Sequence, residues 1–341
     1  MSDTVFRIPP YKVEAVFTTK AETVDWGIDL LGIKPFWRHT KGEGVKVAVL
    51  DTGIAMRHPD LKDAIADAKD FTRSRSGVAD VQGHGTGVAG IVAARENSSG
   101  VIGVAPKAKL LVAKVLDDDG AGRGEYIMKG VEWAVKSGAD IISMSLGSID
   151  NVAGLKKVID AASKKAFVIC AAGNEGPDLG TVNYPAKYES TVSVGAIDRR
   201  RKVAKFSSRG GRVDIVAPGD RILCTYPPRG LARMSGSSMA TPLVSGVVAL
   251  MLSSGNASKI KTSKQLIKQL RSTAVDMGRP GKDPHYGWGI INPTKLLSSG
   301  IHMKSSDIVL TEDDLSESGL EKLRDHFDST GTVTVTIKEN D

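Results

Sequence analysis

Short apolar runs alternate with segments of helical period from about residue 45 to residue 295. The apolar runs carry Val, Ile and Ala on both alternating faces, as parallel strands do when both sides of their sheet are covered. The predicted strands are residues 45–50, 110–116, 140–146, 166–172, 191–197 and 213–217. The predicted helices are residues 84–94, 125–137, 152–164, 238–252 and 263–274. This alternation predicts an α/β fold with a doubly wound, mostly parallel sheet and helices on both faces.

The two ends of the chain differ from this middle part. Residues 1–20 contain Pro9 and Pro10 and no helical period, so we expect an extended arm before a central domain of residues 21–300. Residues 301–341 contain ten acidic and four basic residues, a formal charge of −6. We expect an appended acidic element there, with a strand at 307–310, a helix at 312–327 and a strand at 332–338.

Composition narrows the class of protein. A charged content of 25% and a hydrophobic content of 41% are ordinary for a globular domain. No apolar run approaches the roughly 20 residues that span a bilayer, so a membrane protein is not expected. The net charge of +7 raises the question of nucleic acid, but the basic stretches 199–205 and 259–271 contain no interleaved aromatic residues for stacking on bases. We therefore expect a basic solvated surface and no nucleic-acid partner.

The cysteine content and the start of the chain bear on location. Only Cys170 and Cys224 occur, which gives no sign of a disulfide scaffold and is compatible with a reducing cytoplasm. The first residues lack a basic segment followed by an apolar one, as a secretory signal would have. A cytoplasmic protein is the expectation, and a secreted one is the alternative because some secreted enzymes of this size also lack disulfides.

Three short polar segments stand at the borders of predicted elements. Asp51 ends a predicted strand and begins the turn Asp51-Thr52-Gly53, His84 lies in a glycine-rich segment at a helix start, and Ser238 opens the helix at 238–252. A carboxylate at the carboxyl end of a strand lies where open α/β sheets bind ligands. Taken singly, Asp51 reads as a turn residue, His84 as a surface or capping residue and Ser238 as a helix cap.

Together the three segments resemble the signature segments of subtilisin-like serine proteases, from about residue 23 to residue 297. The matching stretches are Val-Leu-Asp51-Thr-Gly, Gly-His84-Gly-Thr and Gly-Ser-Ser238-Met-Ala-Thr-Pro. The order Asp, His, Ser is that of subtilisin, whereas an α/β-hydrolase runs Ser, Asp, His and carries a G-x-S-x-G turn that the Ser238 segment lacks. The resemblance implies that Ser238 attacks the scissile carbonyl, that His84 transfers the proton and that Asp51 orients the imidazole.

The resemblance also assigns substrate-binding residues. Asn174, in Ala-Ala-Gly-Asn174-Glu-Gly, matches the oxyanion-hole amide beside the backbone N–H of Ser238; in isolation it reads equally well as a structural turn residue. Two edge segments are expected to clasp an extended peptide by backbone pairing. They are Gly120-Ala121-Gly122 and Ser145-Leu146-Gly147.

The sequence departs from the family pattern at two places: the pocket for the residue before the cleaved bond, and the helix that begins at His84. Glu175 matches the rim of that pocket and suggests tolerance of basic side chains, while Asn183 replaces a common glycine at its base. We expect Asn183 to shrink or re-tune the pocket. Gly87 stands where many relatives have a second histidine, which affects packing and not chemistry.

A structural calcium ion is implied by a further match, to the high-affinity calcium loop of the family. Hard oxygen donors from a loop, a carboxylate and the start of the chain suit the six to eight ligands of Ca²⁺. A plain polar loop is the alternative. The expected ligands are the side chains of Glu22, Asp60 and Asn97 and the backbone carbonyls of Arg95, Ser99 and Val101.

The arm suggests a branch of the family. Arg7-Ile8-Pro9-Pro10-Tyr11 is similar to the short inhibitory extension of intracellular subtilisins, so we expect a zymogen that is activated by cleavage between about Tyr11 and Glu22. An unstructured start is the alternative. Intracellular relatives are dimeric, which implies self-association into a homodimer. The competing functions are a binding protein without turnover and another serine hydrolase such as an esterase; the intact motifs and their order argue against both.

Overall fold

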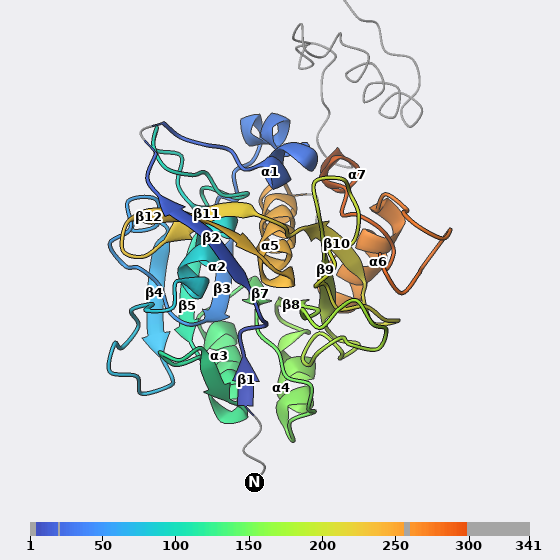
Figure 1. Cartoon of the computed structure of the whole chain (residues 1–341), viewed down its shortest axis with the longest axis horizontal. Helices are drawn as coiled ribbons and strands as arrows, with labels where there is room; N and C mark the ends of the chain where they lie inside the picture. Colours follow the sequence, from blue (N-terminus) through green and yellow to red (C-terminus); the bar gives the residue numbers. More distant parts are fainter. Residues whose placement is uncertain (1–4, 20, 256–259, 299–341) are drawn as a thin grey trace, which may run out of the picture. The chain divides into compact units, whose positions relative to one another are not determined.

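The computed structural model describes residues 5–19, 21–255 and 260–298, and a seven-stranded parallel sheet forms its centre. The strand order is β10-β9-β8-β7-β3-β5-β4 (Figure 1). All its neighbouring pairs are parallel. The strands are β3 (Lys46–Asp51), β4 (Ile65–Asp70), β5 (Lys109–Lys114), β7 (Ile141–Met144), β8 (Phe167–Ala171), β9 (Val192–Ile197) and β10 (Ile215–Pro218).

This sheet confirms the predicted α/β, doubly wound fold. Every predicted strand is present within a few residues of its expected limits. The edge strand β4 was not predicted, because its sequence IADAKD is polar and half exposed and so lacks the apolar run of a buried parallel strand. The chain reverses its direction of winding at β3, which has β5 on one side and β7 on the other. Such a switch point opens a crevice at the carboxyl ends of the strands.

Two pairs of helices pack on the sheet, α2 with α5 and α3 with α4. All ten residues of α2 and fifteen of the seventeen in α5 are buried, so both helices are surrounded by the rest of the protein on nearly every side. These two helices begin at His84 and at Ser237, which places both candidate catalytic side chains at the ends of rigid elements. The helices are α1 (Trp26–Leu30), α2 (His84–Ala93), α3 (Gly124–Lys136), α4 (Leu155–Ala162), α5 (Ser237–Ser253), α6 (Ser263–Thr273), α7 (Pro293–Ser298) and a 3₁₀ helix, Lys34–Arg38.

Two small antiparallel sheets involve the amino-terminal arm, which is extended as predicted. In one, β1 (Val5–Arg7) pairs with β6 (Ala121–Arg123). In the other, β2 (Lys12–Phe17) is the outer strand beside the hairpin of β11 (Ile222–Tyr226) and β12 (Gly230–Ser235). Figure 1 shows the arm, in dark blue, running past the central sheet from β1 to β2.

The described residues up to Leu297 form one compact unit. The predicted strand-helix-strand element at 301–341 lies outside the described residues. Cys170 and Cys224 are buried and free, as expected. In the described part of the chain, no helix is long and apolar enough to cross a membrane.

Asp25 joins the start of the central domain to the β11–β12 hairpin. Its carboxylate caps α1 by accepting from Gly27 N at 2.7 Å and accepts from Leu223 N at 2.8 Å. Desolvation by burial outweighs these hydrogen bonds and raises the pKa of Asp25 from 3.8 to about 6.

We predict that Asp25 makes stability depend on pH. The folded state favours the protonated carboxyl, so wild type loses stability relative to Asp25→Asn as pH rises from 4 to 6, by about 3 kcal/mol in total, and the difference stays constant above pH 6. Urea unfolding of both proteins between pH 4 and 7 measures it. Asp29→Asn, on the exposed side of the same helix, is the control and has no such trend. Parallel pH curves for wild type and Asp25→Asn would contradict the prediction.

Candidate active site

The predicted catalytic and peptide-clasping residues gather at the carboxyl edge of the central sheet. Asp51 is the last residue of β3. Ser145 follows β7 directly and Asn174 follows β8 by three residues. The segment from Gly120 to Gly122 follows β5 through a tight turn and enters β6. Because parallel strands end at the same edge, segments far apart in sequence are brought to one crevice.

Asp51 and His84 form a buried pair. His84 Nδ1 lies 2.7 Å from Asp51 Oδ1, and neither side chain is exposed to solvent. The same Asp51 oxygen accepts from Thr52 N at 2.8 Å. This geometry fixes the orientation of the imidazole and leaves Nε2 directed elsewhere. Within the described residues, His84 Nε2 has no hydrogen-bond partner.

Ser238 lies in the first turn of α5, where backbone N–H groups are unpaired and the helix dipole favours negative charge. Its Oγ makes a long contact of 3.4 Å with the carbonyl of Ser145, while Ser145 Oγ donates to the carbonyl of Ser238 at 2.8 Å. The hydroxyl of Ser238 is therefore beside β7 and is not hydrogen-bonded to His84 in this state.

Asn174 is held so that its amide nitrogen faces the crevice. Ser237 N and Ser237 Oγ both donate to Asn174 Oδ1, at 2.8 and 2.9 Å. The remaining group, Nδ2, donates to the carbonyl of Pro10 at 2.7 Å. A carbonyl of the arm thus occupies the amide donor that the resemblance assigns to the oxyanion hole.

The arm lies between the two segments predicted to clasp a peptide. Phe6 pairs with Gly122 in the β1–β6 ladder, and Phe6 is fully buried. Arg7 exchanges two backbone hydrogen bonds of 3.0 Å with Gly147, and Ile8 N donates to the Gly120 carbonyl at 3.2 Å. The arm is therefore the middle strand of a short three-stranded arrangement within the crevice.

Tyr11 covers His84. The two rings meet edge to face with centroids 4.9 Å apart, and the Tyr11 hydroxyl donates to the carbonyl of Gln82 at 3.3 Å. Burial, followed by the nearby Tyr226 and the carboxylates of Asp51 and Asp80, raises the pKa of the Tyr11 phenol well above its usual range. The group against His84 is thus a neutral phenol.

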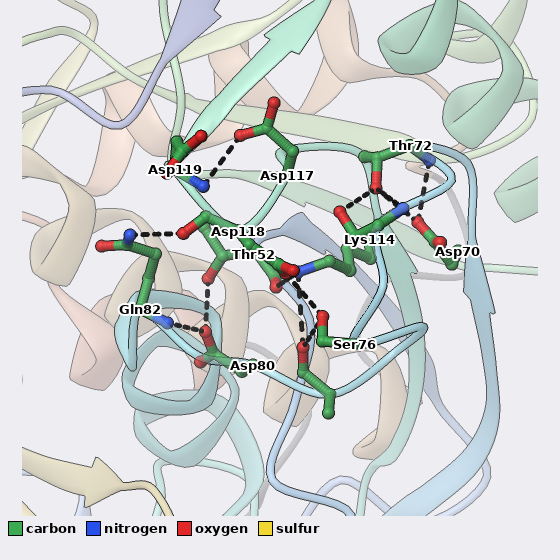
Figure 2. A network of polar contacts seen from close by, with 12 residues as sticks. Thr52, Asp70, Thr72, Ser76, Asp80, Gln82, Lys114, Asp117, Asp118 and Asp119 are labelled. Atoms are coloured by element: carbon green, nitrogen blue, oxygen red, sulfur yellow. Dashed lines mark hydrogen bonds and ion pairs between the residues drawn. The ribbon is translucent and has the colours of Figure 1, made fainter.

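Asp80 joins the helix of His84 to the strand of Asp51. Its Oδ1 accepts from Thr52 Oγ1 at 2.9 Å, as Figure 2 shows. The same oxygen accepts from Gly83 N at 2.8 Å. Its Oδ2 accepts from the N–H and the hydroxyl of Thr86, at 2.8 and 2.7 Å. Thr52 Oγ1 in turn accepts from Gly85 N at 2.9 Å. One buried carboxylate and one hydroxyl therefore fix the two elements that carry the Asp51–His84 pair.

Lys114 supports the same turn from the other side. This lysine ends β5, is fully buried and is the register partner of Asp51. Its Nζ donates to the Thr52 carbonyl at 2.5 Å and lies 3.0 Å from Asp118 Oδ1, as Figure 2 shows. Desolvation would raise the pKa of Asp118, but the hydrogen bonds from Ser76 and Lys114 outweigh it and hold that pKa below its usual value. The turn that leads into β6 is thereby tied to the turn after Asp51.

The predicted pocket residues lie together near the oxyanion amide. Asn183 is buried, and a Cβ placed on Gly147 would lie 3.0 Å from its Cβ. Glu175 accepts from Ser208 Oγ at 2.8 Å, and both lie against Gly173. Asn183 thus fills space between the segments that follow β7 and β8, while the Glu175 carboxylate is directed toward Ser208.

The predicted calcium residues also lie together. Asp60 is buried, and its two oxygens accept from Asn97 Nδ2 at 2.9 Å and Val101 N at 3.0 Å. Glu22 accepts from Asn97 N at 2.7 Å, a contact with the backbone of the loop that the sequence did not indicate. In the described residues, no group of three or more His, Cys, Asp or Glu side chains could hold a metal. A cation here would need backbone and amide oxygens in addition to Asp60.

The structure explains the glycine at position 87. A Cβ there would lie 2.9 Å from Met234 Sδ and 3.1 Å from Cys224 Sγ. Two buried sulfur atoms fill the space beside α2, so any side chain at this position would collide with them.

Sequence reasoning missed Asp80, Thr52 and Lys114 as parts of the site. A signal existed for Asp80, since an acidic residue shortly before a helix start is typical of a cap. Lys114 interrupts the apolar run 110–116 and could have been noticed as a charge forced into a buried strand. Thr52 lies within the matched Asp51 segment, but nothing local indicates its role, which depends on three segments that meet only in the fold.

Comparison with known proteins gives one consistent result. Residues 42–289 match the profile of the subtilase family. The chain is 42% identical over 266 residues to an "Intracellular serine protease" of Paenibacillus polymyxa, covering 75% of this chain and 82% of that protein. It is 42% identical over 260 residues to the "Major intracellular serine protease" of Bacillus subtilis strain 168, covering 72% and 82%. It is 41% identical over 278 residues to "Subtilisin DY" of Bacillus licheniformis, covering 80% and 98%.

We predict that Thr52→Val slows the reaction of Ser238 with a fluorophosphonate about 100-fold, because small displacements of reacting groups cost rates of that order. The change removes the hydroxyl that bonds Asp80 and leaves Gly85 N–H buried without its acceptor. Thr52→Ser keeps the hydroxyl and should retain most of the rate. Both variants are compared with wild type by labelling time courses and by thermal melting. Equal labelling rates for Thr52→Val and Thr52→Ser would show that the hydrogen bonds of the Thr52 hydroxyl do not position the catalytic residues.

Proposed function

The chain belongs to the subtilase family and is a serine endopeptidase, and from this premise we propose that Asp51, His84 and Ser238 perform the hydrolysis and that the amino-terminal arm restrains it. The observation that carries the second part is the hydrogen bond from Asn174 Nδ2 to the Pro10 carbonyl. An arm bound in this way imitates the acyl side of a substrate.

The proposed chemistry follows from the arrangement of the three side chains. Ser238 Oγ attacks the scissile carbonyl carbon, and His84 Nε2 takes its proton, while Asp51 holds Nδ1–H and stabilises the imidazolium. Negative charge on the carbonyl oxygen is met by Asn174 Nδ2 and by the N–H of Ser238 at the start of α5. His84 then protonates the leaving amine, and a water molecule, deprotonated by His84, hydrolyses the acyl-enzyme. Loss of the Asn174 donor would cost about 3–4 kcal/mol of transition-state stabilisation.

The substrates we propose are extended protein segments with little sequence restriction. The support is the arm itself, which backbone hydrogen bonds join to Gly120 on one side and to Gly147 on the other. Such pairing recognises the backbone of the substrate and depends only weakly on its side chains. At the residue before the cleaved bond, Asn183 and Glu175 are the groups expected to set preference, toward smaller or basic side chains.

The arm is held in an unreactive arrangement. The bond at the reacting position is Pro10–Tyr11, and Tyr11 lies against His84 while Ser238 Oγ points to Ser145. Pro10 has no N–H and a fixed φ, which limits how the arm can adjust. The base and the nucleophile are therefore both engaged by other groups while the arm is bound. Activation by cleavage between about Tyr11 and Glu22 would release this restraint.

The location we propose is the cytoplasm. Its support is the names of two relatives, which describe those proteins as intracellular. A homodimer stays a prediction from the resemblance.

We predict that Phe6→Ala in the full chain raises the initial rate of peptide hydrolysis by at least tenfold over wild type. Phe6 is fully buried in the arm–crevice contact, and truncating a buried Phe costs about 3 kcal/mol or more, which weakens docking without touching the triad. Initial rates with a quenched fluorogenic peptide, together with fluorophosphonate labelling, measure the effect. Val5→Ala, on the exposed side of the same strand, is the matched control and should leave the rate unchanged.

Ser238→Ala separates the two parts of the proposal. It should abolish both hydrolysis and labelling in the wild-type and Phe6→Ala backgrounds. Hydrolysis that persists in Ser238→Ala would overturn the triad. Equal rates for Phe6→Ala and wild type, with Ser238 still required, would overturn only the restraint by the arm.

We also propose a structural Ca²⁺ ion at the loop of residues 95–101. The support is the donor set: a buried Asp60 carboxylate, the amide of Asn97 and the backbone of a loop folded closely around them. A Cβ on Gly100 would lie 2.2 Å from Asp60 Oδ2, so only glycine lets the loop approach this carboxylate. Arg95, Ser99 and Val101 would add carbonyl oxygens, and Glu22 would close the site from the arm side. The ion would hold the loop and take no part in the chemistry.

We predict that a chelator lowers the melting temperature of full-length Ser238→Ala by roughly 5 °C or more, because an ion bound only by the folded state stabilises it. Added calcium should restore the melting temperature. Asp60→Asn should abolish the response, and Asp63→Asn, an exposed carboxylate nearby, should keep it. A melting temperature that is unaffected by chelator would contradict the site.

A further inference from the structure

Beyond Pro10, whose carbonyl accepts from Asn174 Nδ2, the arm continues as a regular strand. Residues Lys12–Phe17 of β2 pair antiparallel with β12, from Ser235 opposite Lys12 to Leu231 opposite Phe17, with one irregularity near Arg233. Ser235 is only three residues before Ser238, so β12 leads directly into the catalytic end of α5. The edge of β12 that β2 covers is therefore continuous with the crevice.

The hydrogen bond at Asn174 sets the numbering along this strand. With the Pro10 carbonyl at the oxyanion amide, Tyr11 is the first residue after the reacting bond. Glu14 is then the fourth residue after that bond and Phe17 the seventh. The six residues of β2 accordingly occupy the leaving-group side of the crevice, while β1 occupies the acyl side.

Two side chains of β2 meet groups suited to them. The Glu14 carboxylate lies 2.8 Å from Arg221 Nε, at the start of the hairpin, and Glu14 is the less exposed partner. Arg233, a second cation, lies opposite Ala15 and donates to the Arg221 carbonyl at 3.3 Å. At the far end, Phe17 packs on an apolar cluster. The cluster consists of Ala94, Val101, Leu223 and Leu231.

We propose that the edge of β12 is a substrate groove for the leaving-group side of extended polypeptides, favouring an acidic residue fourth after the cleaved bond and a large apolar residue seventh. This inference rests on the proposed function, in which the arm is removed. Once β2 leaves, β12 presents unpaired N–H and C=O groups and the cluster loses its cover. A substrate strand that pairs with β12 bonds these backbone groups and covers the cluster again, and the backbone pairing supplies most of the affinity.

The test uses the full chain with a recognition sequence for an unrelated protease inserted after Thr18. Cutting the folded protein there, followed by dialysis, removes the arm without requiring a truncated chain to fold. Two fluorogenic peptides share their acyl side and end either two or eight residues after the cleaved bond. The longer one carries Glu at the fourth and Phe at the seventh position, and mass spectrometry locates the cleaved bond. We expect its kcat/KM to be about tenfold higher, from the added strand pairing.

Substitutions then separate the contacts. Replacing the fourth residue of the long peptide by Lys should lower kcat/KM about threefold, the size expected of an exposed ion pair. Arg221→Gln should abolish that difference and leave the short peptide unaffected. Arg229→Gln, on the tip of the same hairpin and away from Glu14, is the control and should retain it. Replacing the seventh residue by Ala should lower the rate with every variant.

Equal kcat/KM for the long and short peptides would overturn the groove while leaving the protease intact. A preference for Glu that survives Arg221→Gln would overturn its assignment to that residue. Failure to cleave even the short peptide after arm removal would count against the proposed function itself. The three results are distinct because the short peptide reports on the triad alone.

Discussion

The parallel order of the central sheet is the constraint on which the site depends. Seven strands end at one edge, and winding reverses at β3, so the segments after β3, β5, β7 and β8 have to share one crevice. Asp51, the clasp segments and Asn174 are all placed by this one geometric fact. His84 and Ser238 come from helices, but both helices are buried along nearly their whole length, which fixes their first turns against the same edge.

Within that frame, buried charge is concentrated where orientation matters. Lys114 and Asp80 are desolvated at a cost that apolar residues would avoid, and each is compensated by several hydrogen bonds. Their common target is Thr52, which is held by its carbonyl and its hydroxyl at once. Such an arrangement gives up some stability and gains a single orientation for the pair of Asp51 and His84. The same lysine also reaches Asp118, so the turn that leads into β6, the partner strand of the arm, and the turn that follows Asp51 are parts of one polar network.

Much of the fold followed from the sequence because buried parallel strands and amphipathic helices have strong periods. The polar edge strand β4 and the short β6 could not be predicted, since neither contains enough buried residues to show a hydrophobic period. The three polar motifs marked the site, and the extended arm was visible from its two prolines. The registers of β1 and β2 were not predictable, because they depend on pairing with residues more than a hundred positions away. Glu22 was expected as an ion ligand, and the structure places its carboxylate on the backbone N–H of Asn97, a contact that no local pattern encodes.

The end of the arm and the first residues of the central domain contact the loop of residues 95–101. Thr19 Oγ1 donates to the Gly100 carbonyl, Glu22 accepts from Asn97 N, and Phe17 packs on the apolar cluster that contains Val101. Two binding events that share such a segment are thermodynamically linked, and linkage is reciprocal. A ligand that orders this loop would raise the affinity of the arm for the crevice by some factor. The docked arm would raise the affinity of the loop for that ligand by the same factor. If the arm restrains the enzyme as proposed, its release would therefore be coupled to this loop, away from the Asp51–His84 pair, and the resting state would be set at two places at once.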